Sequence, residues 1–122
     1  MAQERRAFPR VDTEHSLQLL DADGAAFPAL MLDLSLAGMQ LLCDGPTALR
    51  LAGREGEEPR EFDVRLQVTL PRHGARQLRM RCRLMTIREV QQDEFRIGVR
   101  FTQFEADSYP LLEAWIDETL PD

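Results

Sequence analysis

Apolar and polar residues alternate along three consecutive stretches in the second half of the chain. In residues 61–70, EFDVRLQVTL, every second side chain is apolar, and RQLRMRCRL and EFRIGVRF repeat this pattern. A period of two residues is typical of a strand with one buried face. The turn-forming segments PRHGAR and EVQQDE separate the three runs, so the pattern predicts three sequential antiparallel strands. The residues predicted to face inward are Phe62, Val64, Leu66, Val68, Leu70, Leu78, Met80, Cys82, Leu84, Phe95, Ile97, Val99 and Phe101.

The first half of the chain predicts three more short strands. The segment SLQLL precedes a turn at DADG, a second strand covers Leu30–Leu34, and a third covers Met39–Cys43 after a tight turn at SLAG. Six strands with one apolar face each cannot bury that face in a flat sheet, so a curled or closed small barrel is expected. Residues 44–60 contain Gly, Pro and charged residues without a clear period and are predicted to form a long surface loop, with a helical turn conceivable at TALRLA.

A helix is predicted only at the end of the chain, over residues 106–120. Asp107 or Ser108 can cap its N-terminus, and Pro110 is tolerated in the first turn. Its apolar stripe consists of Leu111, Leu112, Trp115, Ile116 and Leu120. The predicted fold is therefore mostly β: one domain over residues 1–122, with a flexible N-terminal arm (1–12), a six-stranded antiparallel barrel (13–104) and a C-terminal helix.

Composition narrows the classes of partner. The chain has 122 residues, is 43% hydrophobic and carries a formal net charge of −6. An acidic protein is poorly suited to bind nucleic acid or an anionic membrane surface, since binding to either requires an extended positively charged surface. No stretch approaches the roughly eighteen apolar residues that would span a bilayer, and the N-terminus lacks the apolar segment of a signal peptide. We therefore expect a cytoplasmic protein without membrane insertion or nucleic-acid binding.

Catalytic and metal-binding arrangements are not recognisable in the sequence. Cys43 and Cys82 lie in apolar runs, and His15 and His73 are isolated. This spacing fits neither a disulfide framework nor a metal site, and no nucleophile has a suitable base at a familiar distance. We expect neither enzymatic activity nor a metal or cofactor.

The segment DLSLAG, residues 33–38, is a candidate binding element. If Leu30, Leu32 and Leu34 share the inner face of their strand, Asp33 and Ser35 are neighbours on the outer surface. The glycine that follows stands where the chain reverses, which suits positive φ or a close approach of another group. By itself, however, such a segment is more often an ordinary β-turn with Asp and Ser as turn formers.

A second segment near the N-terminus makes the combination more specific. Arg6 and Arg10 form an RxxxR pattern, with Arg5 just before it. Asp33, Ser35 and Gly38 form [DN]xSxxG, and twenty-two residues lie between Arg10 and Asp33. The two patterns, in this order on a six-stranded chain with a C-terminal helix, resemble the signature of the PilZ domain. IGVRF, residues 97–101, is similar to the last barrel strand of that family, and the resemblance extends from residue 5 to about residue 120.

The resemblance implies a bacterial receptor for cyclic di-GMP that acts on a downstream protein in motility, biofilm, pilus or virulence control. It implies a ligand site formed by Arg5, Arg6, Arg10, Asp33, Ser35 and Gly38. Arginine can donate two hydrogen bonds to O6 and N7 of guanine or to a phosphate, and a carboxylate or hydroxyl can accept from N1 and N2 of guanine. Arg5, as an additional cation, is similar to family versions that take a stacked pair of ligands. The arm is expected to become ordered on binding, which would provide the signal.

Some alternatives remain open on the sequence alone. The outward arginines, namely Arg65, Arg79, Arg81, Arg83, Arg96 and Arg100, are either further ligand contacts or solvated side chains paired with Asp and Glu across strands, and the second reading is expected for most. The main rival function is a PilZ-like adaptor that binds protein and no nucleotide. The chain is expected to be a monomer or a weak homodimer.

Overall fold

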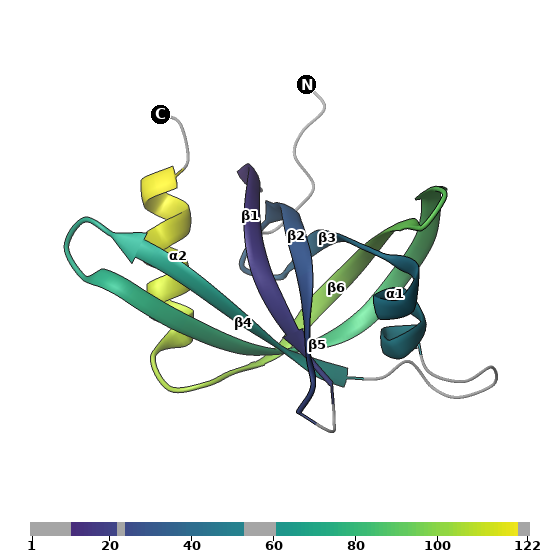
Figure 1. The fold of residues 1–122 in the computed structure, drawn as a ribbon. Helices are drawn as coiled ribbons and strands as arrows, with labels where there is room; N and C mark the ends of the chain where they lie inside the picture. The colour runs from purple at the N-terminus through teal and green to yellow at the C-terminus, as the bar shows by residue number, and fades with distance from the viewer. Residues whose placement is uncertain (1–10, 22–23, 53–60, 120–122) are drawn as a thin grey trace.

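The computed structural model describes residues 11–21, 24–52 and 61–119. The elements, in chain order, are β1 (Val11–Leu20), β2 (Ala26–Leu34), β3 (Gly38–Cys43), α1 (Gly45–Ala52), β4 (Glu61–Leu70), β5 (Gly74–Gln91), β6 (Glu94–Phe104) and α2 (Ser108–Thr119) (Figure 1). The predicted arm, except for its last two residues, lies outside the described residues.

The six strands form a closed antiparallel barrel in the order β1-β2-β3-β6-β5-β4. Neighbouring strands of the barrel are consecutive in the sequence, with two exceptions: β3 pairs with β6, and β4 pairs with β1. The barrel is closed by a short pairing of Gln18–Leu20 with Asp63–Arg65. The predicted six-stranded antiparallel barrel with a C-terminal helix is thus confirmed.

Helix α2 covers the side of the barrel where β1 and β4 separate. These two strands diverge beyond their short pairing, and α2 contacts β4 and β5 (Figure 1). The ring of His15 on β1 meets Trp115 edge to face with centroids 5.3 Å apart, and its Nε2 is 2.7 Å from the carbonyl oxygen of Gln67. The helix therefore fills the opening with an apolar stripe, whose described members Leu111, Leu112, Trp115 and Ile116 are all buried.

The interior of the barrel is apolar, as the alternating pattern predicts. Val64, Leu66, Leu78, Cys82 and Ile97 are completely buried. Burial of a side chain of this kind stabilises the fold by roughly 1.5–3 kcal/mol. Two phenylalanines of β6, Phe95 and Phe101, are only partly buried and pack against this core.

The inner face of β2 differs from the prediction. Met31 and Leu34 are completely buried, whereas Leu30 and Leu32 are half-buried. An irregularity in the pairing of β2 with β3 between Met31 and Asp33 interrupts the alternation, so Met31 and Leu34 both reach the core. A bulge of this kind places two residues opposite one, and a strict two-residue period cannot anticipate it.

Residues 44–60 are not simply a surface loop, because α1 occupies Gly45–Ala52. Asp44 caps this helix: its Oδ1 accepts a hydrogen bond from the backbone N–H of Thr47 at 2.9 Å, and its hydrogen bonds with Thr47 lower its carboxyl pKa. Ala48 and Leu51 are buried against the core. The capping Asp followed by a proline in the first turn was the sequence signal for this helix.

Two strands are longer than predicted. β2 begins at Ala26 and includes Pro28. β2 pairs with β3 only from Leu30 onward, so Pro28 has no strand neighbour on the β3 side. Proline is tolerated at such an edge because its missing N–H is not needed there. β5 continues to Gln91, so the turn before β6 is only Gln92 and Asp93, the latter at φ 58°.

The N-terminus of α2 is attached to β5 by a buried hydroxyl. Asp107 stands at the cap, since its carbonyl accepts from the N–H of Leu111, while Oγ of Ser108 accepts from the backbone N–H of Arg79 at 2.9 Å. Ser108 is only 3% exposed. Its hydroxyl thus satisfies a β5 amide instead of capping the helix.

We expect Ser108→Ala to lower the free energy of unfolding by about 1–3 kcal/mol, because the Arg79 amide would remain buried without an acceptor. Urea unfolding followed by circular dichroism measures this difference. Ser16→Ala, at an exposed position of β1, is the control and should change stability by less than about 0.5 kcal/mol. Equal effects of the two substitutions would contradict the assigned role of Ser108.

Candidate functional site

The DLSLAG segment forms the end of β2, a tight turn and the first residue of β3. The N–H of Ser35 donates to the carbonyl of Gly38 at 2.9 Å, and Oγ of Ser35 accepts from the N–H of Ala37 at 3.1 Å. Ser35 is 2% exposed. The prediction that Ser35 lies on the outer surface beside Asp33 is therefore wrong: its hydroxyl holds the turn together from inside.

Gly38 is required by the close approach of β3 to β6. A Cβ atom at this position would lie 2.1 Å from the carbonyl oxygen of Val99, and no side chain can be accommodated without moving backbone. The adjacent carbonyl of Ala37 accepts from the N–H of Phe101 at 2.9 Å. The glycine thus serves the strand pairing, not a positive φ.

Asp33 remains on the outer side of β2, where it is half-buried. It pairs in register with Gln40 of β3 on one side and with Asp12 of β1 on the other. The next pair is Val11 with Leu34, so β1 begins beside the residues that lead into the turn. Arg10 directly precedes Val11 in the sequence, and Arg5, Arg6 and Arg10 lie outside the described residues.

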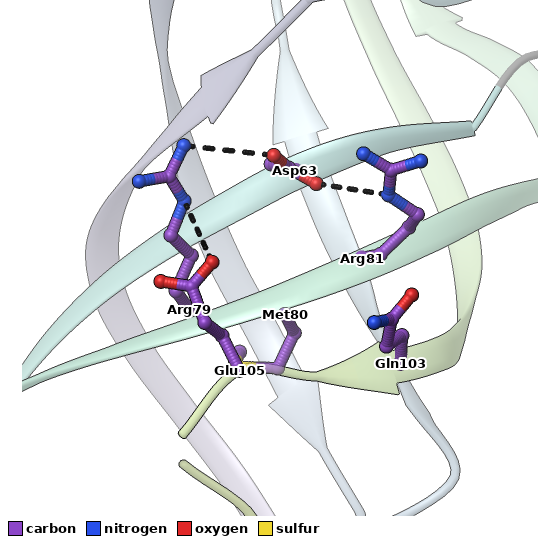
Figure 2. Close-up of a pocket in the computed structure, with 6 residues that line it drawn as sticks. All are labelled: Asp63, Arg79, Met80, Arg81, Gln103 and Glu105. Atoms are coloured by element: carbon purple, nitrogen blue, oxygen red, sulfur yellow. Dashed lines mark hydrogen bonds and ion pairs between the residues drawn. The ribbon is translucent and has the colours of Figure 1, made fainter. Parts of the chain in front are cut away.

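The arginines on the β4–β5 side of the barrel have carboxylate partners. Asp63 lies 3.6 Å from Nη2 of Arg79 and 3.3 Å from Nε of Arg81, and Arg83 lies 3.1 Å from Glu61. Figure 2 shows Arg79 and Arg81 on either side of Asp63, in a small pocket of about 100 Å³. The expected pairing with acidic side chains across strands is confirmed for these three arginines.

This pocket is already neutralised by its own side chains. Glu105 adds a second carboxylate, 3.9 Å from Nε of Arg79, and the remaining lining residues are Met80 and Gln103 (Figure 2). Its arginines are 40–51% exposed, so each of these ion pairs is screened by solvent and contributes little to stability. The cavity is a poor candidate for an anionic ligand, because its cations are occupied.

The cysteines have the properties of core residues. Cys43 is 8% exposed and Cys82 is completely buried. Desolvation by burial, with a smaller contribution from Asp44, raises the pKa of Cys43 to about 11, and burial raises the pKa of Cys82 further. A thiol in this state is a poor nucleophile at neutral pH. Within the described residues, no cluster of His, Cys, Asp or Glu is arranged to hold a metal ion, and no helix is long and apolar enough to cross a membrane.

The family model of the PilZ domain matches residues 4–118, which span the barrel, both helices and the RxxxR segment. The chain belongs to the PilZ domain family. No match was found among curated proteins. PilZ domains are regulatory receptor domains, and two of the solved relatives are structures of YcgR from Escherichia coli with c-di-GMP.

Solved structures share the fold of this PilZ domain at low sequence identity. The inhibitor of motility MotI/DgrA from Bacillus subtilis gives a TM-score of 0.71 at 12% identity over 95% of this chain and 51% of its own. The PilZ domain of YcgR from Escherichia coli, solved with c-di-GMP, gives 0.62 at 20% over 95% and 92%. MrkH of K. pneumonia in its apo state gives 0.62 at 13% over 98% and 52%. The chain therefore spans about half the length of MotI/DgrA and of MrkH.

The contact at Gly38 generates a prediction about stability in the absence of ligand. We expect Gly38→Ala to lower the free energy of unfolding by about 1–3 kcal/mol, because the added methyl would overlap the Val99 carbonyl. Urea unfolding measures this difference. Gly74→Asn is a suitable control, since its φ of 71° is compatible with Asn and its surroundings are open. A stable Gly38→Ala protein would show that β3 can move away from β6.

The burial of both thiols leads to a prediction about their chemical reactivity. At pH 8 the folded protein should not react with a thiol reagent such as Ellman's reagent, since both thiols remain protonated below a pKa of about 11 or higher. Unfolding in guanidinium should release both thiols at their ordinary reactivity. Rapid reaction of the folded protein at pH 8 would contradict the burial of the cysteines.

Proposed function

We propose that this PilZ domain binds cyclic di-GMP between the RxxxR segment and the outer side of β2 at Asp33. The observation that carries the proposal is the register of β1 on β2, in which Val11 pairs with Leu34. Arg10 is one peptide bond from Val11, and Arg6 is four residues further. At roughly 3.5 Å per residue, an extended segment of that length spans about 14 Å, enough for Arg6 and Arg10 to contact one ligand at Asp33.

The residue types match the chemistry of the dinucleotide. Each guanine presents O6 and N7 as paired acceptors, which the planar guanidinium of Arg6 or Arg10 can bind with two hydrogen bonds, and each phosphate accepts charge-assisted bonds from the same groups. The carboxylate of Asp33 suits the N1 and N2 donors on the opposite edge of a guanine. Arg5 supplies one more cation and would favour a stacked ligand pair.

Ser35 and Gly38 contribute to this site through the backbone. The hydroxyl of Ser35 and the missing side chain of Gly38 fix the turn that follows Asp33. Both would therefore hold Asp33 in position, and direct contact with ligand would be made by the charged side chains. This differs from the resemblance alone, which implies a ligand contact for every residue of the signature.

Signalling would follow from the joining of two parts of the chain by one ligand. Binding would connect the segment that carries Arg6 and Arg10 to the outer side of β2, and a partner protein would recognise the resulting surface. A ligand can shift an equilibrium only by its difference in affinity for the two arrangements. The domain would therefore act as a cyclic di-GMP effector without catalytic activity.

The test is a calorimetric titration of cyclic di-GMP into the wild-type protein and into Arg6→Ala/Arg10→Ala. Loss of two arginine contacts of about 1–3 kcal/mol each should weaken binding at least about 30-fold. Asp33→Asn should weaken it less, because the amide keeps an oxygen acceptor and loses only the charge. The stoichiometry separates a single ligand from a stacked pair.

The matched control is Arg72→Ala/Arg76→Ala, which removes the same charge at two exposed positions around the β4–β5 turn. Its affinity should stay within about threefold of wild type, since screening weakens charges at a distance. Equal weakening by both double variants would indicate a general effect of charge. Absence of binding by the wild-type protein would favour a protein-binding adaptor.

A further inference from the structure

The outer face of β3, β6 and β5 contains a second group of arginines whose surroundings differ from those near Asp63. Gln40, Thr86, Arg88 and Arg96 line a hollow of about 340 Å³ on this face. They come from three neighbouring strands, in which Gln40 pairs with Gly98 and Gly98 with Thr86. We call this cavity the Gly98 hollow.

Gly98 forms the floor of the hollow, beneath the side chains of Thr86 and Gln40. A Cβ atom at Gly98 would lie 2.6 Å from Oγ1 of Thr86 and 2.9 Å from Nε2 of Gln40. The two polar side chains therefore converge above the glycine. Around this floor the hollow offers a hydroxyl, an amide and two guanidinium groups, a lining that can donate several hydrogen bonds.

Arg88 and Arg96 are directly opposite each other across β5 and β6. Like charges at such positions repel, because their Cβ atoms lie only about 5 Å apart. Within the described part of the chain, neither arginine has an ion pair, whereas Arg79, Arg81 and Arg83 each have at least one. Glu94 is the nearest acidic residue along β6, and its carboxylate accepts a hydrogen bond from Gln91.

The Gly98 hollow continues the surface on which Asp33 lies. Asp33 pairs with Gln40, so Asp33, Gln40, Gly98 and Thr86 form one row across four strands. Gly98 is two strands away from Asp33, a separation of about 10 Å at roughly 4.8 Å per strand. One extended anionic ligand could thus contact Asp33 and the hollow at the same time.

We propose that the Gly98 hollow binds a phosphodiester group of the dinucleotide, with Arg88 and Arg96 as its cationic ligands. An anion between the two guanidinium groups removes their mutual repulsion and replaces it with charge-assisted hydrogen bonds. Gln40 and Thr86 complete the site as neutral donors. This inference rests on the proposed function, and it extends the ligand surface from β2 to β5.

The phosphodiester can belong to the far side of the ligand at Asp33 or to a second dinucleotide stacked on the first. Both sources present the same chemistry to Arg88 and Arg96, and the stoichiometry distinguishes them.

The experiment is a calorimetric titration of cyclic di-GMP into the full chain carrying Arg88→Gln/Arg96→Gln, beside wild type and Arg72→Gln/Arg76→Gln. The glutamines keep polar, hydrogen-bonding side chains, although shorter ones, and remove both charges. We expect affinity at least tenfold weaker than in the control if the two arginines hold the far phosphodiester, at unchanged stoichiometry. If they hold a second ligand, the stoichiometry should fall from two to one.

Thermal unfolding without ligand shows that the variant is folded. Removal of two opposed charges should leave its midpoint equal to or above that of wild type. A folded Arg88→Gln/Arg96→Gln protein that titrates like the control, while Arg6→Ala/Arg10→Ala loses binding, would overturn this inference and leave the proposed function intact. A wild-type protein that takes up no dinucleotide would overturn both.

Discussion

The close contact between β3 and β6 at Gly38 is the constraint on which the candidate binding face depends. A Cβ at Gly38 would come within 2.1 Å of the Val99 carbonyl, so only glycine allows the two strands to pair through the start of β3. The same contact brings Ala37 within hydrogen-bond distance of Phe101 and positions the turn that Ser35 closes. Asp33, just before this turn, is held on the outer side of β2 as a result. The pairing of β3 with β6 and the position of Asp33 therefore depend on the same contact.

The distribution of charge on the barrel explains how an acidic protein can present a cationic surface. All 15 basic residues are arginines, and the net charge is −6. On β4 and β5 the acidic residues Asp63 and Glu61 lie against arginines and neutralise them. On β6 and the distal part of β5, Arg88 and Arg96 face each other without such partners among the described residues. Net charge describes the molecule at a distance, whereas a small ligand responds to the local arrangement.

The architecture was accessible from the sequence because burial imposes a two-residue period on β4, β5 and β6. The errors occur where local geometry departs from that period. The bulge after Met31 places both Met31 and Leu34 in the core. Helix α1 has only eight residues, so its helical periodicity was a weaker signal than the Gly and Pro residues that indicate a loop. Strand order was also out of reach, since the β3–β6 pairing joins residues 52 to 62 positions apart, from Cys43 with Phe95 to Gly38 with Arg100. The Gly98 hollow depends on that pairing, so no pattern along the chain could identify it.

The signature residues fall into two physical groups, and this division determines what a match to the signature means. Ser35 and Gly38 are buried and serve the turn and the strand contact, so a barrel that binds nothing would still need them. Asp33 is half-buried on the outer side, and the RxxxR arginines have no part in the interior pattern that predicts the strands. The xSxxG part of the signature therefore serves the fold, while the proposed ligand contacts are assigned to the charged residues. Under the proposed function, a relative that kept Ser and Gly but lost the arginines would keep this barrel and lose the proposed contacts to a guanine dinucleotide. Such a loss would be the physical distinction between a receptor and an adaptor built on one fold.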